Sequence, residues 1–180
     1  MKPFHLAIIV ATLGVGIGLG YSLYQKESVT VTTPKEIADK PEKLDRLPDF
    51  SFPDLQGNSR TSQEWQDKIV VLNFWATWCP PCRKETPAFI EVQSSYPQQV
   101  QFVGIAIDDQ QPVQDFADEF GINYPTLLGD MSAIEISRQL GNRFSGLPFT
   151  AIFNQSGKLV YQRTGEVKKT ELTEQIKALL

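Results

Sequence analysis

The chain has 180 residues, of which 41% are hydrophobic and 11% aromatic, and its formal net charge at pH 7 is −4. This composition supports a folded core of one or two domains. The acidic balance argues against nucleic acid as a main partner, because phosphate binding requires a concentrated basic surface.

The first 24 residues contain a run without any charged side chain, from Leu6 to Tyr24. A helix of this length spans roughly 28 Å at about 1.5 Å per residue, which is close to the hydrocarbon thickness of a bilayer. Lys2 precedes the run, so the positive-inside rule predicts a single-pass anchor at residues 1–24 in the cytoplasmic membrane. Everything after Tyr24 would then lie on the periplasmic, or extracytoplasmic, side. The alternative is a cleaved signal peptide.

Residues 25–48 are polar and charged, contain three prolines and show no sustained apolar period. They are predicted to form a flexible linker that holds a folded domain away from the lipid headgroups. The domain itself is predicted to span residues 49–180.

Within residues 49–180, short apolar runs alternate with segments of helical periodicity. The pattern predicts a hairpin with a turn at Gly57 and Asn58, then a helical turn at 62–67. It further predicts buried strands at 69–76 and 101–108, and helices from the cysteines to about 96, at 113–120, 132–140 and 169–180. Strands at 149–154 and 158–165 would close an antiparallel hairpin. Such an order indicates an α/β sandwich with a mixed sheet.

Cys79 and Cys82 are the two cysteines of the chain, and three roles compete for them. A zinc site needs about four ligands, whereas the one histidine, His5, lies in the predicted anchor. No metal site is therefore predicted. A structural disulfide would close too short a loop to restrict the unfolded chain. A copper carrier stays open because thiolates suit Cu(I), although no exported histidine could supply a third ligand.

Redox chemistry fits the position of the pair best. Cys79 follows a predicted strand and begins a helix, whose dipole and free N–H groups favour a thiolate. Cys82 lies one turn later, where it can form or resolve a disulfide with Cys79. Cys79 is therefore the expected attacking thiol, Cys82 the resolving thiol, and no cofactor beyond this disulfide is expected. Arg83 and Lys84 could lower the pKa of Cys79 or simply face solvent.

The sequence WCPPC after a buried strand, Pro87 five residues beyond Cys82, and Gly146-Leu147-Pro148 before a second strand resemble the thioredoxin superfamily. The longer string NFWATWCPPCRKETP resembles the TlpA/ResA-like membrane-anchored disulfide reductases. The resemblance covers residues 49–180. It implies a thioredoxin-like sandwich with a central mixed β-sheet flanked by helices, an N-terminal hairpin and a central insertion. It also implies a cis peptide at Leu147–Pro148, facing the disulfide and binding client proteins.

Several site residues follow from the same resemblance. Glu85 is expected to be catalytic, accepting the proton of Cys82 from one helical turn away, although an exposed glutamate in the first helix is the simpler alternative. Independently of the resemblance, Trp78 borders Cys79 and is expected to shield the thiol and contact clients. Thioredoxins carry an aspartate where this chain has Asn73, which cannot accept a proton. Reductases of cytochrome c maturation often carry Pro-Glu-Thr at the cis-proline, and this chain has Pro148-Phe149-Thr150.

The predicted function is that of a membrane-anchored thiol–disulfide oxidoreductase that reduces disulfides of exported proteins, with cytochrome c maturation as one setting. Its expected partners are client proteins with disulfides or thiols, and a membrane electron donor. Because Pro80 and Pro81 have no N–H to donate to a thiolate, the couple should be reducing, nearer to roughly −270 mV than to −120 mV. The alternatives are a periplasmic thiol oxidase and a thiol-based chaperone or copper carrier. The acidic stretch from Asp108 to Glu119 is interpreted as a solvated surface.

Overall fold

The computed structural model describes residues 43–180. The predicted anchor and most of the predicted linker lie outside the described residues. Within residues 43–180, no helix combines the length and the apolar character needed to cross a membrane.

A five-stranded mixed sheet forms the centre of the domain, with strand order β5-β4-β3-β6-β7. β3 (Ile69–Trp75) pairs in parallel with β4 (Val100–Ala106), which pairs in parallel with β5 (Thr126–Leu128). β6 (Phe149–Phe153) and β7 (Leu159–Thr164) are antiparallel to their neighbours. The predicted mixed sheet is therefore confirmed.

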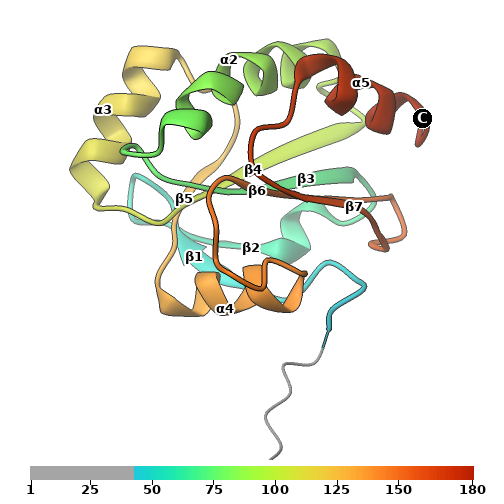
Figure 1. Ribbon diagram of the computed structural model, residues 1–180, viewed down its shortest axis with the longest axis horizontal. Coiled ribbons are helices and arrows are strands. Elements are labelled where there is room, and N and C mark those ends of the chain that lie inside the picture. Colours follow the sequence, from blue (N-terminus) through green and yellow to red (C-terminus); the bar gives the residue numbers. More distant parts are fainter. Residues whose placement is uncertain (1–42) are drawn as a thin grey trace, which may run out of the picture. The chain divides into compact units, whose positions relative to one another are not determined.

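Helices cover both faces of this sheet (Figure 1). α2 (Pro80–Ser95), α3 (Gln110–Phe120) and α5 (Lys169–Lys177) lie on one face. α4 (Met131–Gln139) lies on the other face, together with a hairpin of β1 (Ser51–Pro53) and β2 (Ser59–Thr61) that leads into a short 3-10 helix, η1 (Ser62–Trp65). Because β3 is central and covered on both faces, all of its residues are buried, as its apolar run predicts.

Three clusters of buried side chains fill the spaces between these layers. The first lies between the sheet and the α4 face and includes Leu72 and Phe74. The second lies between the sheet, α2 and α5, and includes Phe89. The third joins Cys79 and Cys82 to residues of β3, β4 and α3. The two cysteines are thus part of the packed interior rather than of a surface loop.

Two features depart from the expected element order. β5 was not predicted, because three residues at a sheet edge are too few to show a period. The last residues of the predicted linker also contact the domain: Leu44 N–H donates to Gln139 O at 3.0 Å and Leu47 N–H to Gly157 O at 2.8 Å. Both leucines pack against the first cluster. Packing therefore begins before Asp49.

Candidate active site

The two cysteines lie where β3 gives way to α2. Cys79 is the N-cap of α2, and Pro80 and Pro81 occupy the first two helical positions. Proline suits these positions because their N–H groups have no partner within the helix. The Cys82 N–H points at Cys79 Sγ, at 3.4 Å. The two sulfurs form a disulfide.

The surroundings of the disulfide differ sharply in exposure. Cys79 is 4% exposed and Cys82 is 1% exposed, whereas the adjacent Trp78 is 66% exposed. Both cysteines are thus covered in the disulfide form, and the attacking role of Cys79 stays a prediction. The indole of Trp78 is the accessible group beside the sulfurs.

The Leu147–Pro148 peptide is cis, as predicted. Leu147 packs against the cluster that holds the two cysteines. Leu147 and Trp78 also line one mainly apolar cavity of about 240 Å³, together with Phe74, Ile107 and Ile134. The structure therefore brings two of the three predicted client-contacting residues, Trp78 and Leu147, to one cavity, whereas Pro148 is buried and does not line it.

Glu85 lies on α2, one turn after Cys82, and is only 2% exposed. Its carboxylate accepts two hydrogen bonds, from Asn73 Nδ2 to Oε1 at 2.9 Å and from the Val167 N–H to Oε2 at 3.0 Å. The simpler alternative, an exposed glutamate of the first helix, is therefore wrong. Glu85 is a buried acid attached to the central strand and to the loop before α5.

Burial raises the pKa of Glu85 to about 7. The hydrogen bonds from Val167 and Asn73 stabilise the ionised form and offset part of this effect, and the nearby carboxylate of Glu166 adds to the rise. A carboxyl group with a pKa close to 7 can both accept and return a proton at neutral pH. Glu85 thus has the burial and the titration range of an acid–base group.

Asn73 connects Glu85 to a row of small or polar residues that runs across the sheet. Its Nδ2 also donates to Thr150 Oγ1 at 3.1 Å. Thr126, Gly104, Asn73 and Thr150 are register partners on four adjacent strands, so all four lie on the sheet face that α2 covers. Sequence reasoning singled out Asn73 but missed Thr150, although a threonine within the apolar run FTAIF was a visible exception.

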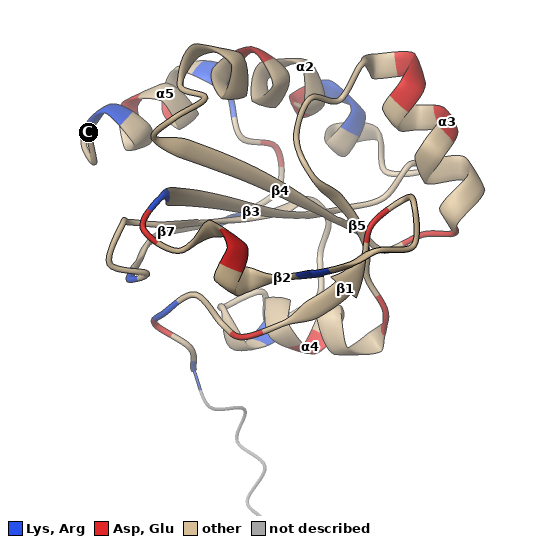
Figure 2. Ribbon diagram, turned by 180° about the vertical axis from the view of Figure 1, so that it is seen from behind, with Lys and Arg blue, Asp and Glu red and all other residues tan. Residues whose placement is uncertain are grey.

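Asp108 also lies at this site, and its interpretation as part of a solvated surface is wrong. The carboxylate follows β4 and accepts from the Thr77 N–H at 3.0 Å and from the Thr77 hydroxyl. Thr77 belongs to the loop between β3 and Cys79, so Asp108 ties down the chain that delivers the cysteine. The other acidic residues of the stretch, on and before α3, are exposed (Figure 2).

Arg83 does not lie free beside Cys79. Its guanidinium stacks over the rings of Phe116, at 4.9 Å, and Phe120, at 5.1 Å, and pairs with Glu119 at 3.5 Å. These contacts hold α2 against α3. The side chain is thus engaged with the neighbouring helix.

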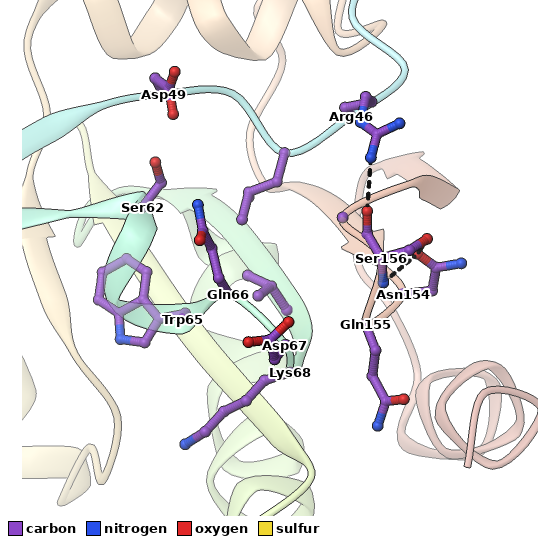
Figure 3. A pocket seen from close by; sticks show the side chains of 13 residues that line it. Arg46, Asp49, Ser62, Trp65, Gln66, Asp67, Lys68, Asn154, Gln155 and Ser156 are labelled. Carbon is purple, nitrogen blue, oxygen red and sulfur yellow. Dashed lines mark hydrogen bonds between the residues drawn. The ribbon is translucent and has the colours of Figure 1, made fainter.

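A polar cavity of about 310 Å³ lies near the start of β3, between η1 and the β6–β7 turn (Figure 3). Arg46, Asp67 and Asn154 are among its lining residues. Since the cysteines follow the other end of β3, this cavity does not contain them. Within residues 43–180, no group of three or more His, Cys, Asp or Glu side chains is placed to hold a metal ion.

Comparison of the sequence with known protein families gives a match. The sequence pattern of the family described as Redoxin matches residues 42–180. The chain belongs to the Redoxin family.

Individual relatives of this redoxin agree with the assignment. It is 31% identical to the thioredoxin-like protein YneN of Bacillus subtilis, over 95% of each chain. It is 28% identical to the thiol-disulfide oxidoreductase ResA of Geobacillus thermodenitrificans, over 99% of this chain and 94% of that one. A thiol:disulfide interchange protein of the thioredoxin family from Chlorobium tepidum shares the fold with a TM-score of 0.66 at 28% identity, over 78% of this chain and 97% of that one. The predicted ResA-like membership of the thioredoxin superfamily is therefore confirmed.

Proposed function

We propose that this protein is a membrane-anchored thiol–disulfide oxidoreductase that reduces disulfides of exported client proteins. The observation that carries the proposal is the pairing of a CxxC disulfide at a helix N-terminus with a buried glutamate one turn later. Relatives named as thiol-disulfide oxidoreductases support the reaction class.

In the first step, the Cys79 thiolate of the reduced protein attacks one sulfur of a client disulfide. A Cys79–client disulfide forms, the client S–S bond breaks, and the second client sulfur leaves as a thiolate. Trp78 and Leu147 line the apolar cavity beside the sulfurs and would receive client side chains that flank the cysteine. Pro80 and Pro81 have no backbone N–H to donate to the Cys79 thiolate, so the Cys82 N–H is its backbone donor within α2 and the thiolate is stabilised less than at a helix start without prolines.

In the second step, Cys82 loses its proton to Glu85 and its thiolate attacks Cys79 Sγ. The Cys79–Cys82 disulfide forms, the Cys79–client disulfide breaks, and the client sulfur that Cys79 had attacked leaves as a thiolate. The client has then gained two electrons and the protein has lost two. Glu85 suits this role because it is buried on the same helix, one turn away, and titrates near neutral pH.

The cellular setting forms part of the proposal. The charge-free run at residues 6–24 supports an anchor in the cytoplasmic membrane, with the domain on the extracytoplasmic side. A dithiol enzyme in that oxidising compartment requires a donor of electrons, so a membrane electron donor is expected. The resemblance to TlpA/ResA-like reductases makes cytochrome c maturation a candidate setting, although this chain has Pro148-Phe149-Thr150 where reductases of that process often carry Pro-Glu-Thr.

Two measurements test this function. Reduction of insulin by the protein with a regenerating dithiol should proceed with turnover and stop in Cys79→Ser. A thiol-based chaperone or copper carrier would bind but not turn over, so the absence of turnover would contradict the proposal.

Equilibration with glutathione then gives the direction of electron flow. A potential near −270 mV, as in thioredoxin, is expected, and one above about −180 mV would indicate a thiol oxidase instead.

A further inference from the structure

Two buried polar atoms lie close to the Glu85 site without a hydrogen-bond partner. Among residues 43–180, the buried side-chain nitrogen and oxygen atoms that lack a partner are Trp75 Nε1 and Thr126 Oγ1. Trp75 is 3% exposed and Thr126 is 6% exposed. Buried donors and acceptors in native proteins are nearly always satisfied, so both atoms require a partner.

Both residues lie beside Gly104, one through its indole nitrogen and the other through strand pairing. A side chain at Gly104 would begin 2.9 Å from Trp75 Nε1, so the indole N–H lies directly over this glycine. Thr126 is the register partner of Gly104 on the adjacent strand, about 4.8 Å away, and on the same face of the sheet. The indole N–H can donate to a small molecule at this point, and the threonine hydroxyl can both donate and accept.

The same location lies between Glu85 and a cavity of about 250 Å³. Asn73, which donates to Glu85, is the register partner of Gly104 on its other side. Thr126 and Tyr124 line the cavity, which is mainly polar and also bordered by residues of α3 and the β1–β2 hairpin. Tyr124 contacts the Gly104 position as well, at 3.4 Å. The sequence of groups therefore runs from Glu85 past Gly104 to Thr126 and the cavity.

We propose that Trp75 Nε1 and Thr126 Oγ1 bind one internal water molecule beside Gly104, and that this water connects the Glu85 carboxyl with the polar cavity. Water fits the site because it accepts from the indole, exchanges hydrogen bonds with the hydroxyl, and needs two to four polar partners. In this arrangement Glu85 receives its proton from Cys82 and passes it outward along the water. The water site itself is independent of the proposed function, whereas its link to proton transfer rests on it.

The charged and polar groups around Glu85 favour release of its proton toward the polar cavity lined by Thr126. The Glu166 carboxylate lies near Glu85 from the loop before α5, and Asn73 and the Val167 N–H face it as donors. On the cavity side, burial and the charge of Glu85 both raise the pKa of Tyr124, so its phenol stays neutral and available as a hydrogen-bonding group. Thr126 is thus a positioning residue that acts through the water.

The water is tested directly on the full-length oxidised protein in mild detergent. Magnetisation transfer from a bound water to the indole N–H of Trp75, assigned with Trp75→Phe, is expected in the native protein and in Thr126→Ser. It should be lost in Thr126→Val, which keeps the shape but removes the hydroxyl. Absence of transfer in the native protein would overturn the water site.

Unfolding by urea gives a second, independent readout. If the hydroxyl holds a water, Thr126→Val lowers the free energy of unfolding, because the indole N–H and the water lose a partner. If the hydroxyl has no partner at all, the same change raises it, and this result would overturn the proposal. Thr126→Ser is the matched control.

The link to Glu85 is tested with an aromatic disulfide, 5,5′-dithiobis(2-nitrobenzoate), and the reduced protein. Attack by Cys79 releases the first nitrothiolate, and attack by Cys82 on the mixed disulfide releases the second. The pH midpoint of the second release should rise in Thr126→Val, because the ionised Glu85 loses hydration, and stay unchanged in Thr126→Ser. An unchanged midpoint in both variants would overturn the link. If the native protein gives no second release, the proposed function fails while the other two measurements still decide the water site.

Discussion

The two faces of the central sheet are built from the same strands but differ in the polarity of their central residues. On the face toward α4 and the hairpin, the residues of the paired central strands β3 and β6 are apolar, with Leu72, Phe74 and Ala151 among them. On the face toward α2, the row through Asn73 and Thr150 interrupts the apolar packing, and Glu85 lies over it. Successive side chains of a strand point to opposite faces of the sheet, so β3 contributes apolar residues to one face and Asn73 to the other.

This difference places the buried ionisable group on one face only, whereas the cavity proposed to receive client side chains borders the other, since Phe74 and Ile134 line it. Burial of apolar groups on the α4 face stabilises the domain, whereas an ionisable group under α2 costs stability when it is charged. Changes on the two faces should therefore have different consequences, and four experiments test whether they do.

The largest effect is expected at the disulfide on the α2 face. Cys79→Ser removes the attacking thiol and should abolish client reduction. Cys82→Ser keeps the attacking thiol but cannot release the client, so mixed disulfides should accumulate and be visible on non-reducing gels. The order of attack would be wrong if Cys82 reacted faster than Cys79 with iodoacetamide in the reduced protein.

On the α4 face, Leu72→Ala should reduce stability and leave the chemistry intact. Leu72 is fully buried, and truncation of such a leucine costs about 2–5 kcal/mol in free energy of unfolding. Urea unfolding measures this loss, and insulin reduction per folded molecule should remain at the native level. A fall in activity per folded molecule would show that the two faces are not separable.

Glu85 should make the α2 face sensitive to pH. Its pKa is raised from 4.5 to about 7 in the folded protein, so the folded state holds the proton more tightly than the unfolded state. The resulting stabilisation is complete below about pH 4.5 and is lost as the pH rises through 7. Between pH 5 and pH 8, the free energy of unfolding should therefore fall by roughly 2–3 kcal/mol because of Glu85 alone.

Glu85→Gln removes this titration. Its free energy of unfolding should vary less with pH than that of the native protein, as measured by urea unfolding at pH 5 and 8. Glu91→Gln, which changes an exposed glutamate of the same helix, is the control and should keep the native pH dependence. Equal pH dependence in native protein and Glu85→Gln would contradict a raised pKa.

The smallest effect is expected at the loop before Cys79. Thr77→Val removes the hydroxyl that donates to Asp108, and Asp108→Ala removes the acceptor. Each should cost about 1–2 kcal/mol in free energy of unfolding, and a double-mutant cycle should give a coupling of about 1 kcal/mol. Asp115→Ala, on the exposed surface of α3, serves as the control. Additive losses would mean that the two side chains do not interact.

The α4 face and the CxxC motif were predictable from the sequence because each carries a local pattern. Apolar runs predicted β3, β4 and β6 within one or two residues, since central strands are buried on both faces. The resemblance to the thioredoxin superfamily, carried by WCPPC and Gly146-Leu147-Pro148, predicted that the loop of Leu147 would lie beside the cysteines. Both kinds of information reside in short stretches of the chain.

The polar row under α2 was only partly predictable, because it depends on how strands far apart in sequence are aligned. Glu85 was expected near Cys82 from helical spacing, but its bond to the Val167 N–H joins residues 82 positions apart. Gly104 and Thr126 carry no local pattern, and they become neighbours of Asn73 only through strand pairing. Asp108 was misassigned for the same reason, since its partner Thr77 lies on a different strand connection.

The hydrogen bond between Asn73 and Thr150 has a consequence for how the sheet assembles. A slip of one residue between β3 and β6 would set Asn73 opposite Phe149 or Ala151 and leave a buried amide without the Thr150 hydroxyl. An unsatisfied buried amide costs about 1–3 kcal/mol, and an all-apolar pair of strands would impose no such penalty. The polar row beneath Glu85 therefore favours the correctly aligned pair of strands over pairs with a shifted register during folding.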